Sequence, residues 1–172
     1  MNEPLTIARI NGLDATAFVE ALGSVFEHSP WVVRRSWRAR PFASRAALHA
    51  AMMDAVAAAT ADERLALIRA HPELAGKAAI AGALTAASRG EQASAGLDQL
   101  TPEEFACFHD LNAAYAARFG FPFIICARLG DKRSILEAMR TRLARAPDTE
   151  LAEALAQIGL ISRLRLFDAV SE

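Results

Sequence analysis

The sequence predicts an all-α protein, and three kinds of observation support this. Alanine, leucine, arginine and glutamate, which are good helix formers, are frequent, whereas valine, threonine and tyrosine, which favour strands, are scarce. Helix-capping residues stand in front of runs whose apolar residues have helical spacing. Prolines and glycines separate these runs. Together the patterns predict about seven or eight helices.

The chain has 172 residues, 53% of them hydrophobic. This length is typical of one domain and is enough to bury a core without disulfides or metals. We therefore expect residues 1–172 to form a single domain.

The helices of the first half can be placed by their caps. Asp14, Ser44 and Thr60 each stand directly before an alanine-rich run and are predicted N-cap residues. Thr60 and Glu63 have the T-x-x-E spacing of a capping box. Pro72 is expected to end the helix that Thr60 begins, and residues 74–86 have a weaker helical pattern.

The second half contains one long helix and two later ones. Thr101 and Glu104 form another capping box, and Gly120 is the expected C-terminal cap. Residues 131–145 and 149–170 return to helical spacing. Two cap candidates stay open for each of these helices, namely Asp131 or Ser134, and Asp148 or Thr149. On the last helix, the apolar residues expected on the buried side are Leu151, Leu155, Ile158 and Leu164.

The segment "FGFPFIICARLG", residues 119–130, interrupts the helices. It is bracketed by glycines, contains β-branched and aromatic residues, and has Pro122, which is excluded from a helix interior. We expect an extended apolar link there. Its backbone N–H and C=O groups must pair with something. A flat polar heterocycle is one possible partner, and a short β pairing or buried packing is the other.

Charge and composition exclude several classes of function. With 19 basic and 20 acidic residues, the net charge of −1 argues against a nucleic-acid-binding protein. The basic cluster at residues 34–40 is read as a solvated helix face rather than a phosphate site. Cys107 and Cys126 have no metal-ligand spacing, so we expect no metal site and no disulfide framework. No run is apolar enough to span a membrane, and free thiols favour a cytoplasmic location.

One histidine stands out by its position. His71 directly precedes Pro72, and a residue before proline is pushed out of helical geometry. The end of the preceding helix carries partial negative charge, which favours a protonated imidazole. His71 is therefore a candidate for proton transfer, although its spacing alone favours a histidine that only caps helix-end carbonyls. The other three histidines are read as structural or solvated: His28, His49 and His109.

A polar group and an arginine are further candidates. On a helix, Ser88, Glu91 and Gln92 would share one face and could bind a urea-like group, but Ser88 and Glu91 also fit a capping box. Arg165 lies between two leucines of the last helix. It either extends its charge to solvent or is buried against an anion such as a carboxylate; Arg163 is the less favoured candidate.

The order of the motifs carries a resemblance. "FEHSPWV…RPF", "HPELAGK", "SRGEQASAGLDQL", "LNAAYAARFGFPFIICARLG" and "LAEALAQIGLISRLRL" together resemble the family of 2-oxo-4-hydroxy-4-carboxy-5-ureidoimidazoline (OHCU) decarboxylases, from about residue 8 to residue 168. The resemblance implies an all-α fold, catalysis without a cofactor, and a homodimer. It also implies a small ureide substrate, OHCU, which the family converts to (S)-allantoin in urate degradation.

The same resemblance implies roles for individual residues. The motifs place His71, Glu91 and Arg165 among the catalytic residues. The substrate-binding residues that they imply are Pro72, Ser88, Gln92, Phe123, Ile124 and Ile125. The chain departs from the family where a lysine is common early in the last motif, since Leu160 and Ile161 stand there.

Two alternatives remain at this stage. A non-catalytic helical interaction module could use "FGFPFII" to bind a partner and "SRGEQ" only as a helix cap. The preceding pathway enzyme, 5-hydroxyisourate hydrolase, has a β-rich fold, which this composition does not favour.

Overall fold

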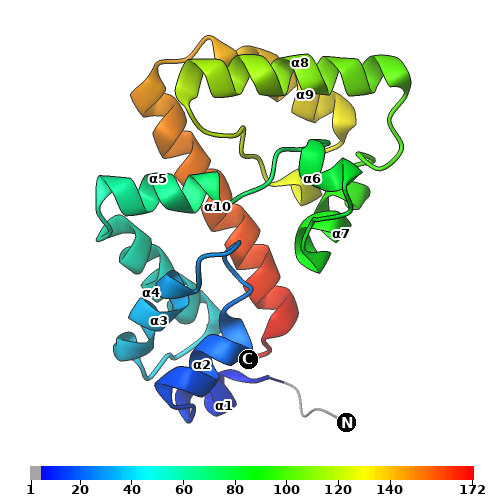
Figure 1. The fold of residues 1–172 in the computed structure, drawn as a ribbon. Coiled ribbons are helices and arrows are strands. Elements are labelled where there is room, and N and C mark those ends of the chain that lie inside the picture. The colour runs from blue at the N-terminus through cyan, green and yellow to red at the C-terminus, as the bar shows by residue number, and fades with distance from the viewer. Residues whose placement is uncertain (1–4) are drawn as a thin grey trace. The chain divides into compact units, whose positions relative to one another are not determined.

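The computed structural model describes residues 5–172, in which helices are the regular secondary structure and loops join them (Figure 1). It contains ten α-helices and two 3₁₀ turns, and its only β pairing is an isolated bridge between Thr6 and Ser171. The all-α prediction is confirmed. The predicted number of helices was too low because three helices have only four to seven residues. Such short segments do not repeat an apolar face often enough to be recognised.

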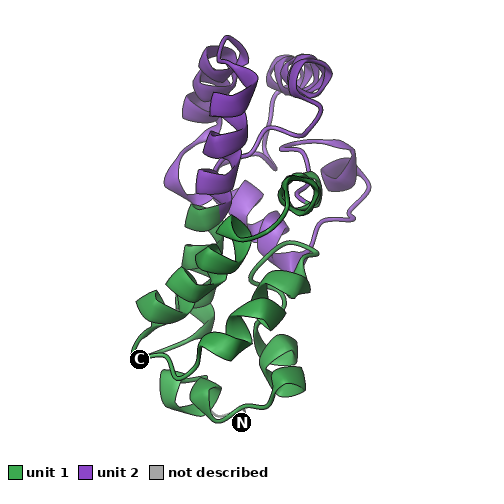
Figure 2. Cartoon of the chain, turned by 90° about the vertical axis from the view of Figure 1, so that its left-hand side faces the viewer, with its two compact units in different colours: residues 1–70, 159–172 green, residues 71–158 purple. Residues whose placement is uncertain are grey.

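The chain falls into two compact units, shown in different colours in Figure 2. Unit 1 consists of the residues up to Ala70 together with Gly159–Glu172, and unit 2 is His71–Ile158. Unit 1 contains α1 (Ile7–Asn11), α2 (Ala15–Leu22), α3 (Pro30–Ser36), η1 (Trp37–Ala39), α4 (Arg45–Ala57) and α5 (Ala61–Arg69). Unit 2 contains α6 (Lys77–Ile80), α7 (Ala86–Ser94), α8 (Pro102–Phe119), η2 (Ala127–Leu129) and α9 (Lys132–Leu143). The last helix, α10 (Pro147–Ala169), contributes to both units. A single domain over residues 1–172 stays a prediction.

The predicted N-caps of unit 1 are confirmed. The side chains of Asp14, Ser44 and Thr60 each accept a hydrogen bond from the backbone N–H three residues later, at 2.9, 3.1 and 3.2 Å. The carboxylate of Glu63 accepts a hydrogen bond from the N–H of Thr60 at 2.9 Å, which completes the capping box. Because each bond satisfies an otherwise unpaired N–H, short polar residues fix where these helices begin.

The caps of α8 and α9 also follow the sequence. The side chain of each member of the Thr101–Glu104 capping box accepts a hydrogen bond from the backbone N–H of the other. Gly120 ends α8 in the left-handed region at φ 76°. Asp131 caps α9, and Ser134 donates its side chain to the same turn, so both candidates take part.

Three local predictions were wrong in whole or in part. The last helix begins at Pro147, ahead of Asp148 and Thr149, because proline fits the first helical position, where its missing N–H costs nothing. Between residues 74 and 86, the only complete helix is Lys77–Ile80, with α7 starting at Ala86; Gly76 begins α6 and Gly82 takes a left-handed φ of 68°. On the expected buried face of α10, Ile158 is buried as predicted, whereas Leu151, Leu155 and Leu164 are only half-buried. The residues that are buried are Glu150, Ala154, Ile158, Ile161, Ser162, Arg165 and Leu166.

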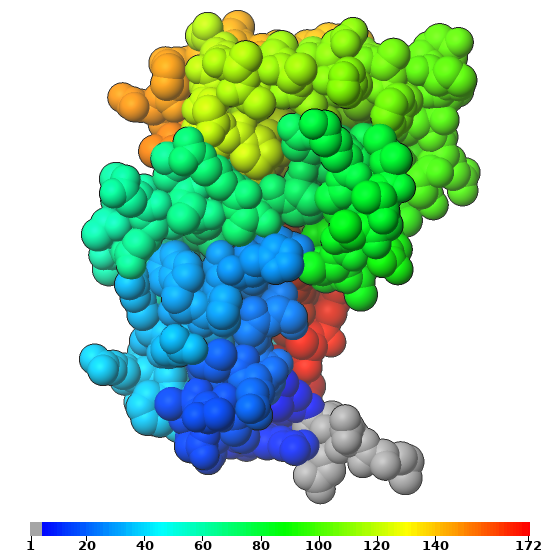
Figure 3. All heavy atoms as spheres, in the orientation of Figure 1, coloured from blue at the N-terminus to red at the C-terminus, as the bar shows by residue number. Residues whose placement is uncertain are grey.

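Each unit has its own apolar core. In unit 1, α2 contributes Phe18 and Leu22 and packs on α3, which in turn packs on α4. In unit 2, α8 and α9 lie side by side, and α8 buries Phe108 and Tyr115 (Figure 1). In Figure 3 the side chains of α6, in green, lie next to those of α8, in yellow-green, on the face that is shown.

The predicted apolar link is shorter than expected. Phe119 still belongs to α8, and residues 127–129 form the 3₁₀ turn η2, so the non-helical part is 120–126. The aromatic rings of Phe121 and Phe123 meet the ring of Tyr115 edge-on, with centroids 5.9 and 5.3 Å away. Such edge-to-face packing holds the link against α8.

Candidate active site

His71 begins the loop that joins the end of α5 to α6. The last helical residue is Arg69, so the histidine lies outside the helix, as the following Pro72 predicts. The side chain of His71 is 7% exposed, and Pro72 beside it is half-buried. A buried imidazole at a helix end is held in one place, which a proton-transfer group requires.

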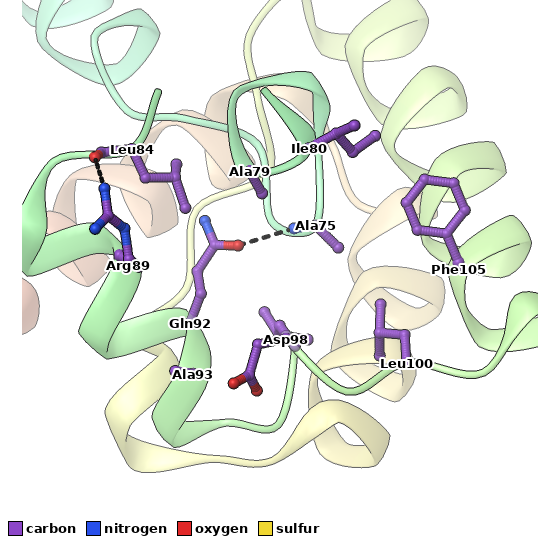
Figure 4. Close-up of a pocket in the computed structure, with 11 residues that line it drawn as sticks. Ala75, Ala79, Ile80, Leu84, Arg89, Gln92, Ala93, Asp98, Leu100 and Phe105 are labelled. Carbon is purple, nitrogen blue, oxygen red and sulfur yellow. Dashed lines mark hydrogen bonds between the residues drawn. The ribbon is translucent and has the colours of Figure 1, made fainter. Parts of the chain in front are cut away.

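Two side-chain amides hold the loop that follows His71. Gln92 Oε1 accepts from the N–H of Ala75 at 3.0 Å, and Gln92 Nε2 donates to the carbonyl of Glu73 at 3.3 Å. Figure 4 shows the first of these bonds, with the amide of Gln92 pointing from α7 to the loop. Asn112 of α8 donates to the carbonyl of Leu74 at 2.9 Å. The loop is thus fixed to two helices.

Helix α7 carries the predicted S-x-x-E-Q group on one side. Its N-cap is Thr85, whose hydroxyl accepts from the N–H of Ser88 at 3.2 Å, so Ser88 lies inside the helix. The capping-box interpretation of Ser88 and Glu91 is therefore wrong. Ser88 and Gln92 are buried, and Glu91 is half-buried. A hydroxyl, a carboxylate and an amide thus come together as the helical spacing predicts.

The link is fixed by side chains of later helices. Arg142 Nη1 donates to the carbonyl of Ile124 at 2.7 Å, and its guanidinium lies 4.3 Å from the centre of the Phe123 ring. Gln157 Oε1 accepts from the N–H of Cys126 at 2.9 Å. Among the described residues, none pairs with the N–H of Ile124 or with either backbone group of Ile125. These groups can bind the edge of a planar polar ligand.

A buried ion pair supports the contact between Arg142 and the link, and no pattern in the sequence pointed to this pair. Glu150 is fully buried and accepts from Arg142 Nε and, at 2.6 Å, from the hydroxyl of Tyr115. Burial, aided by the hydrogen bond to Glu150, raises the pKa of Tyr115 well above its ordinary value. Tyr115 therefore stays neutral at physiological pH, and a second cation, Arg145, lies farther from the carboxylate, with Nη1 3.9 Å from Glu150 Oε2.

Helix α7 packs on the turn that follows the link. The pKa of the Cys126 thiol is consistent with this packing. It is raised mainly by burial and, in second place, by the negative charge of Glu91 on α7. Glu91 is thus close enough to the end of the link to affect its chemistry. Within unit 2, α7 connects the two non-helical segments that carry predicted site residues.

Arg165 belongs to unit 1 and is buried, with 9% exposure. Its Nη1 donates at 2.8 Å to Glu27, which is 3% exposed. The interpretation in which Arg165 extends to solvent is therefore wrong, and burial against a carboxylate is correct. Glu27 was not singled out from the sequence, although it lies within the quoted "FEHSPWV" motif.

The other histidines lie elsewhere. His49 Nε2 is 3.0 Å from the hydroxyl of Ser162, and burial lowers the pKa of His49. His28 and His109 are exposed. Within residues 5–172, no group of three or more His, Cys, Asp or Glu side chains could hold a metal ion, and no helix is both long and apolar enough to cross a bilayer.

The arrangement in unit 2 suits a small planar polar molecule. It combines a buried imidazole, a carboxylate beside a hydroxyl and an amide, and backbone donors and acceptors on a rigid extended segment. An imidazole can transfer a proton, while the carboxylate accepts N–H bonds and the backbone groups read the edge of a ring.

Comparison with known proteins agrees with this geometry. The model of the OHCU decarboxylase family matches residues 11–167. The OHCU decarboxylase of Haloferax volcanii is 40% identical to this chain, over 97% of both chains. The enzyme of the same name from Halalkalicoccus jeotgali is 40% identical, over 94% of this chain and 90% of its own length.

A solved structure agrees as well. The crystal structure of (S)-allantoin synthase has a TM-score of 0.78 to this chain at 28% identity, covering 98% of this chain and 54% of the other. The fold, the motifs and the relatives together show that the chain belongs to the OHCU decarboxylase family.

Proposed function

We propose that this protein decarboxylates OHCU to (S)-allantoin in the degradation of urate. Family membership supports this activity. One structural observation supports the location of the active site in unit 2. The amide of Gln92, from the "SRGEQ" motif, bonds to the loop that begins with His71, from the "HPELAGK" motif. Two motifs on different segments of unit 2, joined by bonds that span 17 and 19 positions, therefore meet at one place.

The reaction can proceed without an added electron sink. The bond between the carboxylate and the ring carbon that bears the hydroxyl breaks, and carbon dioxide leaves. The electron pair moves toward the adjacent C=N bond, whose nitrogen takes up a proton. The enol then tautomerises: its hydroxyl loses a proton to form the ring carbonyl, and the carbon bearing the ureido group gains one. Delivery of that last proton to one face gives the S product.

We assign proton transfer to His71. Its imidazole is suited to donating or accepting a proton near neutral pH, and its buried position limits competition from bulk water. Glu91 would accept N–H bonds from the ureido group or the ring, with Ser88 assisting. The carboxylate would thereby orient the substrate against the imidazole, and orientation alone can supply much of the rate.

The remaining assignments concern binding. Pro72 and Phe123 would form apolar walls, and the backbone of Ile124 and Ile125 would bind the ring edge. Gln92 holds the loop with both ends of its amide, and the second hydrogen on Nε2 and the second lone pair on Oε1 are available for the substrate.

Arg165 is proposed as the residue that binds a carbonyl or anionic oxygen of the substrate. Glu27 would keep the guanidinium in place for this role.

A circular dichroism assay tests the activity. OHCU generated freshly from urate would be mixed with the protein, and the signal of optically active allantoin followed with time. We expect fast formation of (S)-allantoin, whereas the spontaneous reaction gives a slow and racemic product. If the protein does not change the rate, the non-catalytic interaction module becomes the better explanation.

Variants test the roles. His71→Asn should lower kcat by about 10²- to 10⁴-fold, the usual contribution of acid–base catalysis. Glu91→Gln should raise KM and lower kcat because the amide places an N–H donor where an acceptor is needed. His109→Asn, on the exposed side of α8, serves as a matched control that should retain wild-type kinetics. A His71→Asn protein with normal kcat would contradict the proton-transfer role.

We also propose that the protein is a homodimer in the cytoplasm. The family resemblance supports the dimer, and the two free cysteines, Cys107 and Cys126, are compatible with a reducing compartment. Sedimentation velocity at several protein concentrations tests the dimer, and a monomer at all concentrations would contradict it.

A further inference from the structure

We propose that Asn112 of α8 is a positioning residue for His71: it fixes the backbone of the loop 71–76 and so sets where the imidazole lies. The catalytic part of this inference rests on the proposed function. Asn112 lies 41 positions after His71 in the sequence, on a different helix, and none of the motif-based site assignments includes it.

The geometry is specific to this loop. The side chain of Asn112 is 5% exposed, and its Nδ2 donates to the carbonyl of Leu74 at 2.9 Å. Gln92 holds the residues on either side, through the carbonyl of Glu73 and the N–H of Ala75. Three successive residues of the loop are therefore held by side-chain amides, where a helix or strand would use backbone partners.

The loop requires such support. Ala75 takes a φ of 50°, a left-handed conformation that alanine rarely adopts. At Gly76, a Cβ atom would lie 2.6 Å from the Cβ of Glu73, so the backbone turns back tightly on itself. This conformation persists only where its surroundings impose it.

Close packing does not supply that support on every side of the loop. Ala75 lines two pockets of unit 2, of about 530 and about 490 Å³. Figure 4 shows the larger one, with Ala75 and Gln92 on one side and Phe105 of α8 on the other. Ala75 is 7% exposed and is packed on its other sides, so the hydrogen bonds from Gln92 and Asn112 add to the packing that holds the loop.

The choice of asparagine is itself informative. The Oδ1 atom of Asn112 is buried and has no hydrogen-bond partner in the described part of the chain. A buried acceptor without a partner destabilises a fold. The residue is therefore poorly explained by stability alone, whereas its Nδ2 is placed to fix the carbonyl of Leu74.

Loss of the hydrogen bond between Asn112 and the carbonyl of Leu74 should displace the imidazole of His71. Leu74 is three residues from His71, and Pro72 between them limits how the backbone can adjust. A misplacement of about 1 Å can lower a rate about 100-fold. We therefore expect Asn112→Leu to lower kcat by about 10- to 100-fold and to change KM less than about twofold, because substrate contacts remain.

The experiment compares Asn112→Leu with Phe108→Leu in the full-length enzyme. Phe108 is fully buried one turn earlier on the same face of α8 and contacts none of the site residues through a hydrogen bond. The two variants would be compared for kcat, KM, Tm and hydrogen exchange of the peptide that covers residues 71–77. Asn112→Ala provides a second variant without added bulk, should the leucine variant fail to fold.

The proposal predicts faster exchange in residues 71–77 and a lower kcat for the Asn112 variants, with neither change in Phe108→Leu at a comparable loss of Tm. An active wild type with unchanged kcat in both Asn112 variants would overturn the inference alone. The same holds if Phe108→Leu loses as much kcat. A wild type without decarboxylase activity would overturn the proposed function and, with it, the catalytic part of this inference.

Discussion

The loop 71–76 and the link 120–126 are both non-helical and both carry predicted site residues, but they are held by different chemistry. Neutral amides, from Gln92 and Asn112, hold the loop. A buried ion pair, between Arg142 and Glu150, holds the link at the carbonyl of Ile124. A neutral hydrogen bond can be lost at modest cost, whereas a buried charge that loses its partner is strongly destabilising. The link should therefore be the more rigid segment and the loop the more adjustable one.

The largest expected effect comes from the ion pair. Arg142→Met removes the buried cation that bonds to Glu150 and leaves only the hydroxyl of Tyr115 and the half-exposed Arg145, so the free energy of unfolding should fall by about 3–5 kcal/mol, measured by urea denaturation. The double variant Arg142→Met/Glu150→Gln removes both charges and should lose less than Arg142→Met alone. If the single variant is as stable as wild type, the link does not depend on the charged pair and the comparison fails.

A smaller effect is expected from the loop. Gln92→Leu removes two neutral hydrogen bonds and should lower the free energy of unfolding by about 1–3 kcal/mol, with faster exchange of the amide of Ala75. Arg89→Gln, an exposed change on the same helix, is the control and should stay within about 0.5 kcal/mol of wild type. A loss for Gln92→Leu as large as that for Arg142→Met would contradict the distinction between neutral and charged supports.

Alkaline pH should distinguish the two segments. Tyr115, which helps to hold the link, can lose its proton at high pH, whereas the amides of Gln92 and Asn112 that hold the loop cannot. The folded pKa of Tyr115 is raised above its unfolded value of about 10, so its contribution to stability is complete below pH 10 and is lost as the pH rises further. At pH 11 the loss relative to Tyr115→Phe should be about 1.4 kcal/mol, measured by denaturation at pH 9 and pH 11. Parallel pH curves for the two proteins would show that Tyr115 does not titrate as expected.

The smallest effect concerns contact between α7 and the link. Because the charge of Glu91 contributes to the raised pKa of the buried Cys126 thiol, Glu91→Gln should lower that pKa. The ultraviolet absorbance of the thiolate during a pH titration measures it, in a Cys107→Ser background so that Cys126 is the one thiol that titrates. An equal pKa of Cys126 with and without the Glu91 charge would place Glu91 too far from the link to act there.

The same two segments show how far the sequence could be interpreted. His71 leaves the helix because proline follows it, and proline acts through local sterics. The start of the link was predictable from two residues. Gly120 ends α8 as its C-cap, and Pro122, two residues later, prevents the helix from continuing. The supports of both segments were not predictable, since Asn112 and Arg142 come from helices remote in sequence. An asparagine or arginine inside a helical pattern has no periodicity that distinguishes a buried hydrogen bond from solvent exposure.

Arg165 illustrates the same limit. Its position between two leucines left two interpretations open, exposure to solvent and burial against an anion. In the structure Arg165 is buried, and its charge is balanced by Glu27 within hydrogen-bonding distance. The two residues are 138 positions apart, so no local pattern could have paired them. Ser88 and Glu91 were ambiguous for a different reason: a capping box and a shared helix face need the same spacing. Only the observed helix start, with Thr85 as the cap, separated the two.

By itself, the sequence determined the helical class, most helix starts, the break at His71 and the family, because caps, prolines and motif order act over a few residues or are read directly from the chain. The tertiary structure decided which polar residues are buried and what they bind. These include the amides that hold the loop 71–76 and the ion pair that supports the link 120–126. The physical reason is that the energy of a buried polar group depends on a partner distant in sequence, and only the folded chain brings that partner within about 3 Å.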